Sequence, residues 1–119
     1  MKKKPLQEEP EKSPPPGFVP SSRPSPYVAM IGPLFEVPDD PDNRRGFRVL
    51  EGHLNNAGII HGGMVMSFAD NLLARAVSNS GVAMAVTVHM TTDFIGPAHQ
   101  GDWVEGKAHV TRTTRTLVF

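Results

Sequence analysis

One long apolar segment, residues 64–78, constrains the fold of this chain most. Its apolar side chains recur at the three- and four-residue spacing of a helix that buries one face. These positions are Met64, Val65, Phe68, Ala69, Leu72, Leu73, Ala76 and Val77. Met66 and Ala74 extend the apolar surface to further sides, and Gly81 supplies a stop signal. A helix that is apolar on so many sides must be covered, which predicts a sheet wrapped around it.

Alternating patterns on both sides of this segment predict the strands of that sheet. Residues 46–51 set Phe47 and Val49 against Arg48 and Leu50, and with the apolar segment 27–35 they predict a hairpin across a turn at 39–43. Residues 84–94 alternate over a longer stretch and predict a long, half-buried strand. Residues 102–112 and 116–119 predict two more strands. Because the last one stops at Phe119, we expect a domain that is incomplete at its C-terminal end.

The beginning of the chain has a different composition. Eight of the twelve prolines fall within the first 26 residues, among Lys, Glu and Ser and few large apolar side chains. Such a segment buries too little surface to offset the entropy of ordering it, so we expect a disordered or polyproline-like tail at 1–25 and one domain at 26–119. Lys2, Lys3 and Lys4 are followed by Glu and Pro instead of an apolar run, which favours a cytoplasmic protein over an exported one.

Composition excludes several classes of function. Twelve Lys and Arg balance twelve Asp and Glu, so no net charge attracts nucleic acid or an anionic membrane. The longest uncharged run, residues 76–92, is too short and too polar for a membrane span. The absence of Cys removes thiolate chemistry and cysteine-based metal sites, and no two of the five His are placed as a helical ligand pair. We therefore expect no metal and no other cofactor.

The residues that could carry chemistry lie at the start of the predicted helix and in its middle. Gly62 and Gly63 stand at a loop-to-helix junction, where unpaired amides and the positive end of the helix dipole favour a negative oxygen. The same glycines also fit tight packing against a sheet, and His61 also fits a capping role. Asp70 favours the functional interpretation, because a carboxylate inside an apolar helix is costly unless it is paired or used.

The spacing of these residues predicts a site shared between two subunits. Gly63 and Asp70 are seven residues apart, which separates them by about 10 Å along a helix axis. One small carbonyl group cannot contact both. A carbonyl held at the helix start would need the Asp70 of a second, antiparallel copy of the helix, and therefore a dimer.

The order of these features resembles the hotdog-fold thioesterases, in particular the phenylacetate-degradation type of acyl-CoA thioesterase. The resemblance covers about residues 26–119 and is carried by Asn55, by the His61-Gly62-Gly63 run and by Asp70. It implies an α+β fold in which an antiparallel sheet wraps around one long central helix. It also implies a homodimer with the two helices side by side, often paired into a homotetramer.

The resemblance further implies the reaction and the roles of the residues. An acyl-CoA would be hydrolysed to the free acid and coenzyme A without a cofactor. Asp70 would activate water or attack the thioester directly, and both roles stay open. The Gly62 amide would polarise the thioester carbonyl, beside a substrate-binding Gly63, while Asn55 and His61 shape the pocket on the acyl carbonyl side. Thr87 would help to place the nucleophile opposite.

Three other interpretations remain open at the level of the sequence. The first is a hotdog domain that binds acyl-CoA as a sensor and does not cleave it. The second is hydratase or dehydratase chemistry, which the His-Gly-Gly junction fits less well, and the third is a non-catalytic remnant. Asp70 separates the enzyme from the sensor, because a pure binder has no need of a carboxylate facing the carbonyl.

Overall fold

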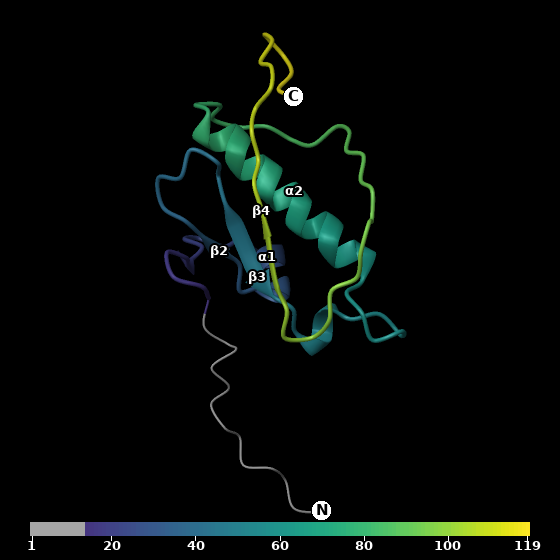
Figure 1. Cartoon of the computed structure of the whole chain (residues 1–119). Helices are drawn as coiled ribbons and strands as arrows, with labels where there is room; N and C mark the ends of the chain where they lie inside the picture. Colours follow the sequence, from purple (N-terminus) through teal and green to yellow (C-terminus); the bar gives the residue numbers. More distant parts are fainter. Residues whose placement is uncertain (1–13) are drawn as a thin grey trace, which may run out of the picture.

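A long helix, α2, packs across one face of an antiparallel sheet (Figure 1). The structure is a computed structural model, and it describes residues 14–119. Its four described strands lie in the sheet order β1-β2-β3-β4. The elements are β1 (Val19–Pro20), α1 (Pro26–Ile31), β2 (Phe35–Glu36), β3 (Arg45–Arg48), the short 3-10 helix η2 (Glu51–His53), α2 (Gly62–Asn79) and β4 (Trp103–Gly106).

The predicted helix and hairpin are both confirmed. α2 buries a stripe of side chains at four-residue spacing, which are Met64, Phe68, Leu72 and Ala76. This stripe packs against β3 and the residue that follows it, where Phe47 and Val49 are almost fully buried and the Phe47 and Phe68 rings lie 4.9 Å apart. Burial of each large apolar side chain contributes about 1.5–3 kcal/mol. The core therefore lies between one face of α2 and the sheet.

The hairpin fixes which side chains of β2 and β3 face α2. Phe35 pairs with Gly46 and Glu36 pairs with Arg45, in antiparallel register. The Asp40 carboxylate accepts the amides of Asp42 and Arg44 and so closes the turn that joins the two strands. Because partners across a ladder share a face, Arg45 and Glu36 lie on the inner side of the sheet.

The outer side of the sheet carries an aromatic cluster around Trp103. Phe18 meets the Trp103 ring edge-on at 5.0 Å, and the Arg48 guanidinium lies 5.2 Å from its centre. Gly46 lies directly beneath this ring, and the ring leaves no room for a side chain at position 46. The residues from Phe18 onward are thus attached to the sheet.

Part of the expected tail belongs to the sheet. β1 pairs with β2 and places Pro20 in an edge strand, where a missing amide is tolerated. The apolar side chains that attach this segment, Phe18 and Val19, are too few to stand out among the surrounding prolines. Residues 1–13 of the expected tail lie outside the described residues.

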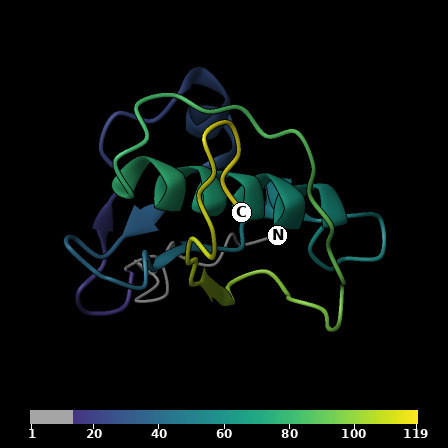
Figure 2. The same cartoon turned by 90° about the horizontal axis from the view of Figure 1, so that it is seen from above.

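The strand predicted for residues 84–94 is wrong for the described chain, because this segment has no ladder partner there. Seen from above, the strands lie on one side of α2, and α1 and the segment that follows α2 lie on the other (Figure 2). Met84, Val86 and Val88 are 89%, 82% and 77% exposed, and the alternate residues are exposed as well. Without a neighbouring strand, the alternating pattern buries neither side.

The last two predicted strands are shorter than expected. The pattern at 102–112 yields only β4, four residues long, and 116–119 contributes a single bridge between Thr113 and Val118. Among residues 14–119, no helix has the length and apolarity that a bilayer span requires.

A buried polar group interrupts the core beneath the hairpin. Arg45 is 1% exposed, and its guanidinium donates to Glu36 Oε2 at 3.3 Å and to Ser21 Oγ at 2.6 Å. Its Nε has no hydrogen-bond partner among the described residues. Burial lowers the pKa of Arg45, the nearby Arg75 lowers it further, and Glu36 opposes both.

This arrangement predicts an asymmetric response to two substitutions. Glu36→Gln leaves a buried guanidinium without its counter-charge and should cost about 2–4 kcal/mol in the free energy of unfolding. Arg45→Met replaces the charge with an apolar side chain of similar length and should cost about 1 kcal/mol or less. Urea denaturation of both variants measures the difference. A larger loss in Arg45→Met would show that the ion pair itself stabilises the fold.

Candidate active site

The first turn of α2 leaves one backbone donor unused. His61 is the N-cap residue, and its Nδ1 accepts the Gly63 amide at 2.7 Å. The His61 carbonyl accepts the Met64 amide at 2.9 Å. Within the described chain the Gly62 amide has no hydrogen-bond acceptor. It therefore stands at the positive end of the helix as a free donor.

Both glycines of this turn are surrounded closely. A Cβ on Gly63 would lie 2.9 Å from His61 Nδ1, so a side chain there would push the capping imidazole away. A Cβ on Gly62 would lie 3.4 Å from the Phe94 ring, which is an ordinary contact distance. The Gly63 amide thus serves the cap, and Gly62 carries the free donor.

Phe94 borders this donor, a role that its position in the sequence does not indicate. Phe94 is 58% exposed, and its ring covers one side of Gly62. The alternating pattern places Phe94 only at the end of the predicted strand 84–94. The signal that could have identified it is an aromatic residue two positions before the Gly96-Pro97 turn. This turn returns the chain to Ile60, whose amide donates to the Ala98 carbonyl.

Asn55 organises the loop that leads into the helix. Its Oδ1 accepts the amides of Ala57 and Ile59, at 2.9 and 3.3 Å, and Gly58 takes a positive φ of 78° within the same loop. The Nδ2 donor of Asn55 has no partner within residues 14–119. The observed contacts of Asn55 are thus those of a loop residue that keeps one amide donor available.

Asp70 lies in the middle of α2 and is held by Thr87. The Thr87 hydroxyl donates to Asp70 Oδ1 at 2.6 Å, from the segment that crosses the helix on the side away from the sheet. Asp70 is half-buried, neither fully covered nor free in solvent. This contact fixes the orientation of the carboxylate and leaves Oδ2 without a partner among the described residues.

The structure does not bring the two halves of the candidate site together within one chain. His61, Gly62 and Gly63 lie at the start of α2, while Asp70 and Thr87 meet near its middle. Asp70 comes eight positions after Gly62 in the helix, which corresponds to about 12 Å along the axis. A single carbonyl carbon cannot be reached from both positions.

Tyr27 of α1 adds a hydrogen bond to the first half of α2. Its hydroxyl lies 2.5 Å from Ser67 Oγ, and the Ser67 hydroxyl donates to the Gly63 carbonyl. α1 is therefore attached to the same turn that His61 caps.

In the described part of the chain, no three His, Asp or Glu side chains gather as metal ligands would.

Comparison with known proteins shows to which family this chain belongs. The model of the thioesterase superfamily matches residues 57–119. A Pseudomonas aeruginosa protein described as an inferred esterase is 35% identical over 108 residues, which cover 88% of this chain and 81% of that protein. Human acyl-coenzyme A thioesterase 13 is 33% identical over 73 residues, covering 60% of this chain and 52% of that protein. An inferred esterase of Caenorhabditis elegans is 35% identical over 71 residues, 40% of its length.

The matched residues include the whole of α2 and the glycines at its start. The chain therefore belongs to the thioesterase superfamily, and its α+β domain is a hotdog thioesterase domain with an open four-stranded sheet in the described part. Membership supports thioester hydrolysis as the general class of activity.

The cap geometry predicts a coupling between His61 and Gly63. In the parent, Gly63→Ala should bring no gain, because the new methyl group displaces the imidazole. In a His61→Ala background, which itself should cost about 1 kcal/mol, the same substitution should stabilise by about 0.5–1 kcal/mol through helix propensity. A double-mutant cycle by chemical denaturation measures the coupling. Equal effects of Gly63→Ala in both backgrounds would contradict the cap.

Proposed function

We propose that this protein hydrolyses an acyl-CoA thioester to the free acid and coenzyme A, with catalytic groups from two subunits. The observation that carries the proposal is the free Gly62 amide at the start of α2. Hydrolysis places negative charge on the thioester oxygen, and a preorganised backbone donor stabilises that charge. His61 contributes by taking the Gly63 amide, so that Gly62 alone faces the substrate.

Asp70 is the group proposed to attack or to activate water. Its Oδ1 is held by Thr87, and its second oxygen is available to accept a proton from water or to add to the carbonyl carbon. Thr87 acts as a positioning residue. As base, Asp70 generates hydroxide at the carbonyl; as nucleophile, it forms an anhydride that water then cleaves. Both routes release the thiolate of coenzyme A.

Two features support a site shared by two copies of the chain. The first is the separation of Gly62 from Asp70 by about 12 Å, which an antiparallel α2 from a second copy would close. The second is the exposed apolar strip after α2, where Met84, Val86 and Ile95 are 89%, 82% and 95% exposed. An apolar strip of this kind marks an interaction surface, and a symmetric dimer would place it beside the site.

The substrate class is proposed from the relatives. Human acyl-coenzyme A thioesterase 13 is named for acyl-CoA hydrolysis, and this chain spans 52% of its length. The Phe94 ring lies next to Gly62, so an apolar acyl chain or aryl group held at the Gly62 amide would contact this ring.

Gly62→Pro removes the proposed donor and retains the helix. Proline is favoured at the first helical position, and the φ of −69° and ψ of 135° at His61 suit a residue that precedes proline. We expect kcat to fall about a hundredfold to a thousandfold in a thiol-release assay with acyl-CoA. Gly62→Ala is the matched control, because it adds the same Cβ near Phe94 but keeps the N–H. Equal losses of kcat in both variants would assign the effect to crowding and would contradict the donor role of the Gly62 amide.

A mixing experiment tests the shared site. Gly62→Pro and Asp70→Asn should each be nearly inactive alone. After subunit exchange, half of the dimers carry one chain of each kind, and each of these has one intact site. About a quarter of parental activity should therefore return. No recovery from two folded variants that form mixed dimers would place the site within one chain. A parent that binds acyl-CoA but releases no thiol would favour a sensor.

A further inference from the structure

A pocket lies between α2 and the segment that enters α1, away from the first turn of α2. Its volume is about 220 Å³. Polar side chains from both segments face it: Ser21, Arg23, Ser25, Asn71, Arg75 and Ser78. None of the residues lining it is a carboxylate. The pocket therefore presents two cations and several hydrogen-bonding groups, with no negative charge.

Neither cation of this pocket forms a salt bridge with a residue of the described chain. No carboxylate among residues 14–119 lies within ion-pair distance of Arg23 or Arg75, whereas Arg44 and Arg45 each have acidic partners. Arg75 is half-buried on α2. A guanidinium that is partly withdrawn from water without a counter-charge is costly, and an anion that enters the pocket would offset that cost.

Two further polar groups without a partner lie in or next to the lining of the pocket. Ser21 lines the pocket, and its hydroxyl also holds Arg45, which is 1% exposed and has an unpartnered Nε. Burial lowers the pKa of Arg45, and the positive charge of nearby Arg75 lowers it further. The side chain of Asn71 makes no hydrogen bond among the described residues, and its Oδ1 is fully buried.

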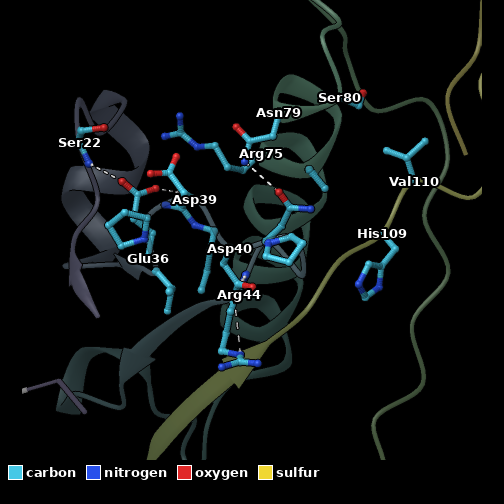
Figure 3. A pocket seen from close by; sticks show the side chains of 16 residues that line it. Ser22, Glu36, Asp39, Asp40, Arg44, Arg75, Asn79, Ser80, His109 and Val110 are labelled. Atoms are coloured by element: carbon cyan, nitrogen blue, oxygen red, sulfur yellow. Dashed lines mark hydrogen bonds and ion pairs between the residues drawn. The ribbon is translucent and has the colours of Figure 1, made fainter. Parts of the chain in front are cut away.

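The opposite side of Arg75 has a different charge pattern. Figure 3 shows Arg75 extending from α2 toward the side of a larger pocket where Ser22 and Glu36 lie. That pocket, about 750 Å³, is also lined by Asp39 and Asp40, so its cations are balanced by acids. Only the smaller pocket is free of carboxylates. An anion should therefore bind on the Arg23 side of Arg75.

We propose that the pocket between residues 21–25 and the C-terminal half of α2 is a binding site for a phosphate group, held by Arg23 and Arg75. Arginine guanidiniums pair with phosphate oxygens in bidentate geometry, and Ser21, Ser25, Ser78 and Asn71 supply further donors. The volume admits a phosphate monoester or inorganic phosphate. The site is separate from Gly62 and Asp70 and does not depend on the proposed hydrolysis.

The experiment is a titration of the isotope-labelled full chain with inorganic phosphate, followed by backbone amide shifts at constant pH and ionic strength. We expect shifts concentrated at residues 21–25 and 71–78. Arg75→Gln should weaken binding about tenfold or more, since each charge-assisted hydrogen bond contributes at least that much. Arg23→Gln on the exposed loop tests the same site without altering α2. Lys107→Gln removes one positive charge outside the pocket and should bind phosphate as the parent does.

Two results would overturn the proposal. One is the absence of amide shifts at residues 21–25 and 71–78. The other is unchanged affinity in both Arg75→Gln and Arg23→Gln. A competition arm identifies the source of the phosphate group. Displacement of phosphate by coenzyme A at the same amides assigns the site to the phosphates of that cofactor, whereas simultaneous binding of both assigns it to a free or differently attached phosphate.

Discussion

The close approach of α2 to β4 is the constraint on which the rest of this structure depends. A Cβ on Gly106 would lie 2.7 Å from a methyl group of Leu72 and 3.5 Å from the Phe68 ring. The absence of a side chain at this position lets the buried stripe of α2 contact the sheet directly. Because the helix is rigid, this contact also sets where its first turn and its middle lie. The free Gly62 amide and the Thr87-bound Asp70 are positioned by the same packing.

The sequence predicted the elements whose patterns are completed within the chain. The three- and four-residue spacing from Met64 to Ala76 identified α2, and the alternation of Phe47 and Val49 identified the inner face of the hairpin. The junction of His61 with Gly62 and Gly63 also indicated the start of the helix. The exact use of its amides could not be predicted, since it depends on which way the imidazole turns. That orientation selects Gly62 over Gly63 as the available donor.

Features that depend on contacts distant in the sequence were not predicted. The strand at 84–94 was inferred from alternation alone, but a strand also needs a ladder partner, and none is present in the described residues. The attachment of residues 18–20 to the sheet was not predicted, because the prolines around them are typical of a disordered tail. Phe94 reaches Gly62 only because the Gly96-Pro97 turn and the Ile60–Ala98 hydrogen bond bring distant residues side by side. The resemblance to a known family implies that Thr87 helps to place the nucleophile opposite, whereas the contact of its hydroxyl with Asp70 Oδ1 within one chain is seen only in the structure.

The aromatic cluster on the outer side of the sheet links the environment of Trp103 to the position of the segment that contains Phe18. Trp103 is the single tryptophan of the chain, and its ring is covered by Phe18 and flanked by Arg48. None of these contacts involves the buried stripe of α2. Release of Phe18 would expose the indole to water while the core stays intact, so intrinsic fluorescence would follow detachment of the segment as an event distinct from unfolding. Local opening and global unfolding can therefore be observed separately in the natural sequence, without an added label.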